Sequence, residues 1–170
     1  LFVFIMFSLL IEGCFTQKDR DFLGMTNDGH RTIKYENGDI YVGYISNGKR
    51  NFSGVYTWVN GDKYEGNWQD GKMNLHGTLS LVSGFKYVGG FRDDLYHGKG
   101  TAMYSNGDKY VGGYKDGKRS GHGSLMFVNG DKYVGYWKND GAHGKGTLSN
   151  IDGSKYVGNF ENGLKHGQGT

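Results

Sequence analysis

The sequence that decides the fold is residues 110–132, YVGGYKDGKRSGHGSLMFVNGDK, because its pattern returns along most of the chain without a shift of phase. Tyr110 has equivalents every 23 residues, and a Gly stands two residues after each of them. These tyrosines are Tyr41, Tyr64, Tyr87, Tyr110, Tyr133 and Tyr156. A fixed period of this length indicates tandem units that stack on one another.

Each unit predicts a β-hairpin. Residues 110–114 and 123–127 alternate with a period of two, which is typical of strands. Between them stand Asp116-Gly117 and residues 118–120, which we expect to form a loop, and Asn129-Gly130 leads into the next unit. Asn-Gly and Asp-Gly favour tight turns because such turns need positive φ. The sequence therefore predicts an all-β fold: an elongated, twisted antiparallel sheet of tandem 23-residue β-hairpin repeats, with about 13 short strands.

The two faces of this sheet follow from the period of two. The first, third and fifth places of a unit, such as Tyr110, Gly112 and Tyr114, share one face with Leu125 and Phe127 of the partner strand. A Gly has no side chain, so it leaves room for an aromatic ring from the adjacent strand. We interpret the aromatic residues and glycines as core rather than as a platform that stacks sugars or bases.

Composition narrows the classes of protein. The 170 residues include 32 Gly, no Pro, 13 Tyr, 10 Phe and 3 Trp, which excludes collagen and a disordered linker. One Cys excludes an intrachain disulfide. Because 20 Lys and Arg stand against 17 Asp and Glu, the net charge of +3 is too small for a dedicated nucleic-acid binder. We expect an ordered domain with no nucleic-acid partner.

Three segments are expected. Residues 1–17 form a hydrophobic leader that opens LFVFIMFSLLI and is typical of a secretory signal, although an anchor remnant or a gene-model artefact would also explain it. Residues 18–40 form a degenerate half-repeat, and residues 41–170 form the array of five full units and a truncated sixth. A real signal implies a secreted or membrane-associated protein, and otherwise we expect a cytoplasmic, membrane-peripheral one.

The units resemble membrane occupation and recognition nexus (MORN) repeats. The resemblance is carried by residues 64–72 (YEGNWQDGK), and by residues 156–163 (YVGNFENG) followed by 166–170 (HGQGT). Some positions depart from the pattern, which puts local loop shape in question. Phe52 and Leu75 replace a Gly of the downstream pair, Asp94 and Asp140 replace the turn Gly, and Ile45 replaces the aromatic.

The resemblance implies a non-enzymatic scaffold for protein–protein interaction or homodimerisation that also associates with acidic phospholipid. The alternative hypothesis is a regulatory repeat region of a truncated enzyme, such as a phosphatidylinositol phosphate kinase-like or SET-domain protein. No cofactor, catalytic residue or small-molecule substrate is expected from these residues.

Five histidines recur at equivalent places but do not predict a metal site. They are His97, His143 and His166 at the eleventh place, and His76 and His122 two places later. Equivalent places in neighbouring units lie two strands apart, roughly 10 Å, whereas zinc ligands converge on bonds of about 2 Å. We interpret them as loop histidines.

Two candidate binding surfaces remain. The twenty-third place carries Lys63, Lys86, Lys109, Lys132 and Lys155. We expect these lysines to line one edge of the sheet, where they would bind acidic lipid. The second and seventeenth places face away from the tyrosines and carry Val42, Val88, Val111, Val134 and Val157 with Met103 and Met126. Since a water-facing side should be polar, this apolar row predicts a surface for a protein partner.

Overall fold

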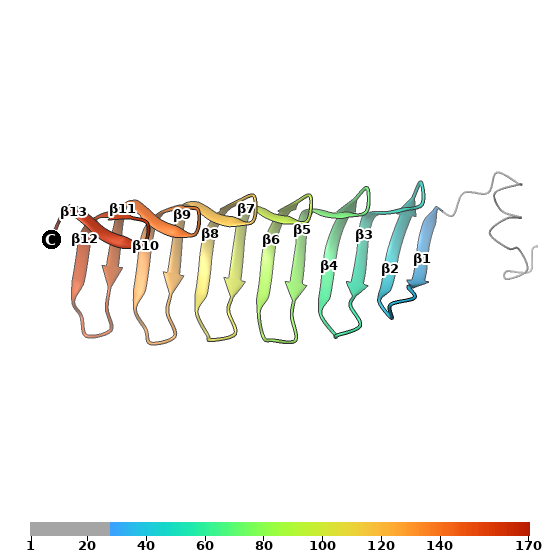
Figure 1. Ribbon diagram of the computed structural model, residues 1–170, viewed down its shortest axis with the longest axis horizontal. Helices are drawn as coiled ribbons and strands as arrows, with labels where there is room; N and C mark the ends of the chain where they lie inside the picture. Colours follow the sequence, from blue (N-terminus) through green and yellow to red (C-terminus); the bar gives the residue numbers. More distant parts are fainter. Residues whose placement is uncertain (1–27) are drawn as a thin grey trace, which may run out of the picture.

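The computed structural model describes residues 28–170, which form one open antiparallel sheet of thirteen strands (Figure 1). The strands are β1 (Gly29–Lys34), β2 (Ile40–Ser46), β3 (Lys49–Thr57), β4 (Lys63–Gln69), β5 (Lys72–Ser80), β6 (Lys86–Arg92), β7 (Leu95–Met103), β8 (Lys109–Lys115), β9 (Lys118–Met126), β10 (Lys132–Lys138), β11 (Gly141–Ser149), β12 (Lys155–Glu161) and β13 (Leu164–Gly169). Their order in the sheet is their order in the chain, so the predicted array of hairpins is confirmed.

Two of the expected segments lie wholly or partly outside the described residues. These are the leader at residues 1–17, with its Cys14, and residues 18–27 of the half-repeat. Within the described part, that half-repeat supplies β1. No helix that could span a membrane is found within residues 28–170.

The hairpin turns are shorter than expected. Asp116 and Gly117 both have positive φ, at 51° and 85°, and this geometry closes a hairpin in two residues. Residues 118–120 therefore belong to β9, and the loop predicted there is wrong. Asp93-Asp94 and Asn139-Asp140 adopt the same positive φ values as the Gly-containing turns. The departures at Asp94 and Asp140 thus leave the turn unchanged.

A bulge bends every hairpin near its tip. The twelfth place of each unit has φ between 56° and 76°, and the strand register shifts beside it. Residues at this place are Phe52, Leu75, Gly98, Gly121, Gly144 and Gly167. In Figure 1 the hairpin tips along the upper margin turn out of the line of the strands. These tips carry side chains over the aromatic face: the guanidinium of Arg119 lies 4.3 Å from the ring centroid of Trp137.

The core lies on the tyrosine face, as predicted. Tyr41, Tyr64, Tyr87 and Tyr110 are fully buried. Each ring lies over the Gly two residues ahead on its own strand and over the paired Gly of the next strand, so the rings come from the same strand as well as from the adjacent one. The hydroxyl then donates to the carbonyl three residues ahead, as Tyr64 does to Asn67 at 2.9 Å.

The rings form one continuous chain of edge-to-face contacts. Each fifth-place ring packs between the Tyr of its own unit and the Tyr of the preceding unit: Trp68 lies 5.0 Å from Tyr64 and 5.6 Å from Tyr41. The same alternation continues through Phe91, Tyr114, Trp137 and Phe160. Burial raises the pKa of the Tyr110 hydroxyl to about 12, since the ionised form would be poorly solvated there.

Candidate functional site

The face of the sheet opposite the tyrosines, here called the open face, carries the candidate functional residues. Along each strand it displays the residues that alternate with the buried ones. In β8 the buried residues are Tyr110, Gly112 and Tyr114, while Lys109 and Val111 are exposed. The open face therefore consists of rows of side chains that run across the strands from unit to unit.

The lysine row comprises the five lysines predicted to bind lipid, Lys63, Lys86, Lys109, Lys132 and Lys155, and all five are exposed. Each is the first residue of its strand, in β4, β6, β8, β10 and β12, so the five lie along one margin of the sheet. Each also precedes a buried Tyr by one residue, so its side chain points to the open face. In the register Lys109 pairs with Met103 on one side and Met126 on the other, which places both methionines in this row.

The valine row runs parallel to the lysine row, and in β6, β8, β10 and β12 its Val stands two residues after a Lys on the same strand. It consists of Val42, Val88, Val111, Val134 and Val157. Thr and Ser side chains of the intervening strands alternate with these valines: Val111 pairs with Thr101 and Ser124. Val111 and Val157 are nearly half exposed, at 47% and 46%, and Met126 is 50% exposed. The two predicted surfaces are therefore a single surface.

A third row on this face was not predicted as a binding surface. It occupies the thirteenth place of the units, two residues before the Thr or Ser of the valine row. Its basic members, here called the histidine–lysine row, are His76, Lys99, His122 and Lys145, and all are exposed. They lie within strands, as do His97, His143 and His166, so the interpretation of all five histidines as loop residues is wrong. The sequence could have predicted this row, because the thirteenth and fifteenth places are two residues apart on one strand and therefore share a face.

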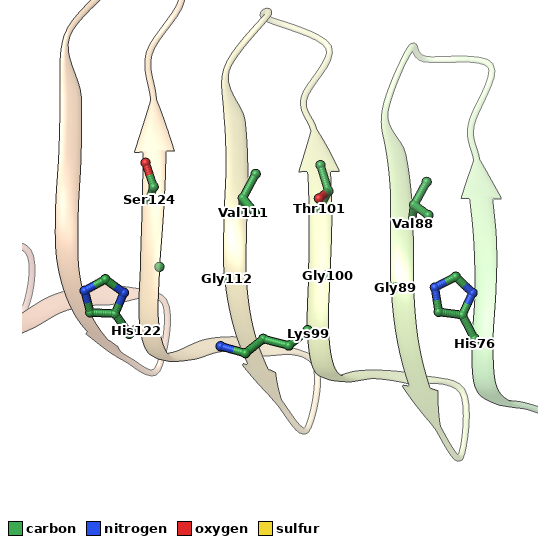
Figure 2. Close-up of a pocket in the computed structure, with 11 residues that line it drawn as sticks. His76, Val88, Gly89, Lys99, Gly100, Thr101, Val111, Gly112, His122 and Ser124 are labelled. Atoms are coloured by element: carbon green, nitrogen blue, oxygen red, sulfur yellow. The ribbon is translucent and has the colours of Figure 1, made fainter.

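The glycines form the floor between the valine row and the histidine–lysine row. Gly89 pairs with Gly100, Gly100 with Gly112, and Gly112 with Gly123. Figure 2 shows Val88, Thr101, Val111 and Ser124 on one side of these glycines and His76, Lys99 and His122 on the other. The result is a shallow hollow of about 410 Å³ over β5 to β9.

Similar hollows continue toward both ends of the sheet. One includes Val42 and Glu65 near β2 to β5, and the other includes Val134, Lys145 and Val157 near β9 to β13. At the fourth place of the central units stand Gly90 and Gly113, whereas other units carry Tyr44, Asn67, Tyr136 and Asn159 there. Neighbouring hollows share His76 or His122 in their linings, so the three hollows together make a groove that crosses the strands.

The charged side chains in the three rows of this groove are almost all positive. Within residues 28–170, Glu65 is the sole carboxylate in the three rows, and it pairs with Lys63 at 2.9 Å. The loop carboxylates are engaged elsewhere: Asp108 accepts hydrogen bonds from the amide of Val128 at 2.9 Å and from Asn106 Nδ2 at 3.0 Å. Lys86, Lys99, Lys109 and Lys132 have no ion-pair partner among the described residues.

The histidines do not assemble into a chemical centre. No group of three or more His, Cys, Asp or Glu able to hold a metal ion is found in the described part of the chain. His97 lies 3.7 Å from Asp116, and His122 stacks edge-on against Tyr136 at 5.6 Å, so each has its own local contacts. The open face offers apolar and cationic contacts.

Comparisons with known proteins agree with the repeat seen in the structure. A family model, MORN repeat, matches residues 41–63, 64–85, 87–109, 110–132, 133–155 and 156–170. No match was found among curated proteins. One of the solved structures that match is the TCP domain of SAS-4 (dCPAP) in complex with a proline-rich motif of Ana2 (dSTIL) of Drosophila melanogaster. It is 15% identical, with a TM-score of 0.43, over 83% of this chain and 87% of that chain.

Proposed function

The chain belongs to the MORN repeat family, and from that premise we propose that it is a non-enzymatic scaffold whose open face binds a protein partner, either another protein or a second copy of itself. MORN repeats are typically binding repeats rather than enzymes. The single observation that carries this proposal is the apolar side chains on the face turned away from the core, which are Val88, Val111, Val134 and Val157 of the valine row with Met103 and Met126 of the lysine row.

The valine row supports partner binding because a water-exposed sheet face normally alternates to polar residues. Val111 is 47% exposed although it lies in the middle of the array, and its register neighbours are Thr101, which carries a methyl group, and the small Ser124. Contiguous exposed apolar surface of this kind usually marks an interaction site. The rings of the opposite face are already buried by their own chain, so the open face is the side available to a partner.

The test places two charges in the valine row. Val111→Lys with Val134→Lys is expected to abolish self-association or partner binding, because a lysine at the centre of an apolar contact must be desolvated. Val82→Lys with Val128→Lys is the matched control, since these valines are 69% and 70% exposed and lie in loops. Sedimentation equilibrium measures self-association, co-precipitation measures other partners, and circular dichroism checks the fold.

Two results would contradict the proposal. One is a wild-type chain that stays monomeric and retains no partner. The other is a Val111→Lys, Val134→Lys variant that loses its β-sheet signal while the control variant keeps it, because the row would then be internal core.

Association with acidic phospholipid is a second candidate function, favoured by the position of all five lysines of the lysine row on one face. Basic residues near an anionic leaflet contribute on the order of 1 kcal/mol each, so binding should be measurable at low salt. The test is sedimentation with vesicles that contain phosphatidylserine. Binding that is absent at low salt, or that is unchanged when all five lysines become Gln, excludes this function.

The hypothesis of a regulatory region within a longer enzyme stays a prediction, which the sequence of the full-length protein would test.

A further inference from the structure

We propose that the groove on the open face binds an acidic amphipathic helix of a partner protein, with the apolar side chains of the helix on the valine row and its carboxylates against basic side chains on both flanks. This inference rests on the proposed function and specifies the chemistry of the partner. It follows from the position of the valine row between two rows that carry basic side chains, the lysine row and the histidine–lysine row.

The two flanks are defined by the strand register. On one side Lys109 stands two residues before Val111 on the same strand and the same face. On the other side Lys99 stands two residues before Thr101, and Thr101 is the register partner of Val111. A ligand that follows the valine row across the strands therefore passes between Lys109 and Lys99. The flanking pair recurs in the next units with Lys86 and His76, and with Lys132 and His122.

Charge complementarity selects an acidic ligand. Lys99 lines the central hollow and Lys109 stands two residues from Val111, and neither has an ion-pair partner within residues 28–170, while Glu65 in β4 pairs with Lys63. An acidic ligand over β5 to β11 therefore meets lysines that form no ion pair in the described part of the chain. Complementary charge of this kind speeds association and sets the position of the ligand in the groove more than it increases the binding affinity. A basic ligand would meet like charge on both flanks.

The spacing favours a helix. Equivalent residues in successive units lie two strands apart, which is about 9.6 Å at 4.8 Å per strand. Seven residues of an α-helix advance about 10.5 Å. A helix with apolar residues in a heptad pattern and Glu beside them would present an acid to each unit in turn. Amphipathic helices use this mode when they lay an apolar face into a groove. Gly90 and Gly113 add no side chain of their own beside His76 and Lys99, their register partners, where such a helix would cross.

A recessed site also favours a helix over a bilayer surface. The glycine floor at Gly100 and Gly112 lies below the side chains of Val111 and Lys99, and these line a hollow of about 410 Å³. A lipid headgroup layer is broad and would contact the rims of such a groove first. A rod-shaped ligand can reach the valine row and both flanks together, so we place the acidic ligand on a protein.

The experiment uses two labelled peptides of 21 residues with the same leucine heptad. One carries Glu beside the apolar ridge, and the other carries Gln at those places, since Gln and Glu have similar helix propensity. Fluorescence anisotropy at low salt measures their binding to the full chain. The Glu peptide is expected to bind about tenfold more tightly than the Gln peptide, and salt should remove most of that difference.

Matched variants locate the effect. Lys99→Gln with Lys109→Gln removes one cation from each flank and should reduce the preference for the Glu peptide to about twofold. Lys49→Gln with Lys118→Gln removes the same charge from exposed residues at hairpin tips and should leave the preference unchanged. Val111→Ser with Val134→Ser should weaken both peptides equally, because it acts on the valine row that they share.

The outcomes separate this inference from the proposed function. Equal binding of the two peptides that is lost in the Val111→Ser, Val134→Ser variant overturns the acidic partner and leaves the open face as a protein-binding surface. Binding of neither peptide, together with strong binding to phosphatidylserine vesicles, overturns the inference in favour of a membrane. A preference for the Glu peptide that falls equally in both lysine variants also overturns it, because net charge alone would then be responsible.

Discussion

The phenol ring of Tyr110 lies over Gly123 of the neighbouring strand so closely that a Cβ at residue 123 would overlap the ring. The same ring covers Gly112 on its own strand, and its hydroxyl donates to the carbonyl of Gly113 at 3.0 Å. One side chain thus contacts two strands, and its hydrogen bond to its own strand holds the ring in place. The relationship recurs in every unit of the array, which explains why the Tyr and its two glycines repeat together.

Gly123→Ala should destabilise the protein by about 1–3 kcal/mol, because the added methyl group meets a buried ring that cannot move without breaking its contacts. Gly123 has no positive φ, so backbone strain does not contribute. In an ordinary strand the same change is favourable by about 0.5–1 kcal/mol. Urea denaturation measures the effect, with the neighbouring Ser124→Ala as control. An increase in stability would show that Tyr110 does not need the glycine.

Leu75→Gly should stabilise the protein by about 1 kcal/mol. Leu75 has a φ of 56°, a region that is strained for side-chain-bearing residues by about 1–3 kcal/mol, and its side chain is 68% exposed, so little burial is lost. Four other units already carry Gly at this place. Leu95→Gly is the control: Leu95 has ordinary strand geometry, and its replacement should be destabilising. Denaturation midpoints decide, and a loss of stability in both variants would contradict the strain argument.

Most of the fold could be predicted from the sequence because its determinants are local. The period, the two strands per unit and the buried face at Tyr110, Gly112 and Tyr114 all follow from alternation within a few residues. The bulge could not be predicted in this way. Nothing in the sequence distinguishes Gly121, which has a positive φ, from glycines in extended strands. Phe52 and Leu75 have the same positive φ at the equivalent place, although residues with a side chain disfavour that conformation. Packing of the hairpin tip on the aromatic face outweighs local preference there.

The binding surface could be predicted only in part. Lys109 and Val111 were assigned to separate surfaces, although residues two apart on a strand must share a face. The histidine–lysine row was missed for a different reason. His122 and Lys99 lie on different strands, and only the register between strands shows that they belong to one row. The residue type in that row also changes between His and Lys from unit to unit. A repeat search detects identical residues and does not detect a shared charge.

Tyr114→Phe should leave stability unchanged or raise it by up to about 1 kcal/mol. The Tyr114 hydroxyl is buried and has no hydrogen-bond partner in the described part of the chain, so its removal relieves a desolvation cost. Tyr110→Phe is the matched comparison and should cost about 0.5–1.5 kcal/mol, because it removes the bond to the Gly113 carbonyl. Thermal denaturation of the two variants compares them directly. Equal losses would show that the Tyr114 hydroxyl is bonded in solution.

Acid should weaken the junction between the partial unit and the first full unit, because the carboxylate of Asp39 holds it together. This carboxylate is buried and accepts bonds from Tyr56 Oη at 2.6 Å, from the Val59 amide at 2.8 Å and from Asn37 Nδ2 at 2.8 Å. The bond from Tyr56 is the main cause that lowers the pKa of Asp39, opposed by desolvation. A carboxyl whose pKa is lower in the folded state stabilises the fold above its ordinary pKa of about 3.9. That stability is lost as the pH falls through the folded value.

The urea midpoint of the wild type is therefore expected to drop between pH 5 and pH 2. Asp39→Asn should have a lower midpoint at pH 7 and a smaller drop, since it has no proton to gain. Tyr56→Phe should move the drop to higher pH, because it removes the main donor to the carboxylate. Asp70→Asn is the control: other units carry Asn at that turn position, so its pH profile should follow the wild type. An Asp39→Asn profile that parallels the wild type would assign the acid sensitivity to other carboxylates.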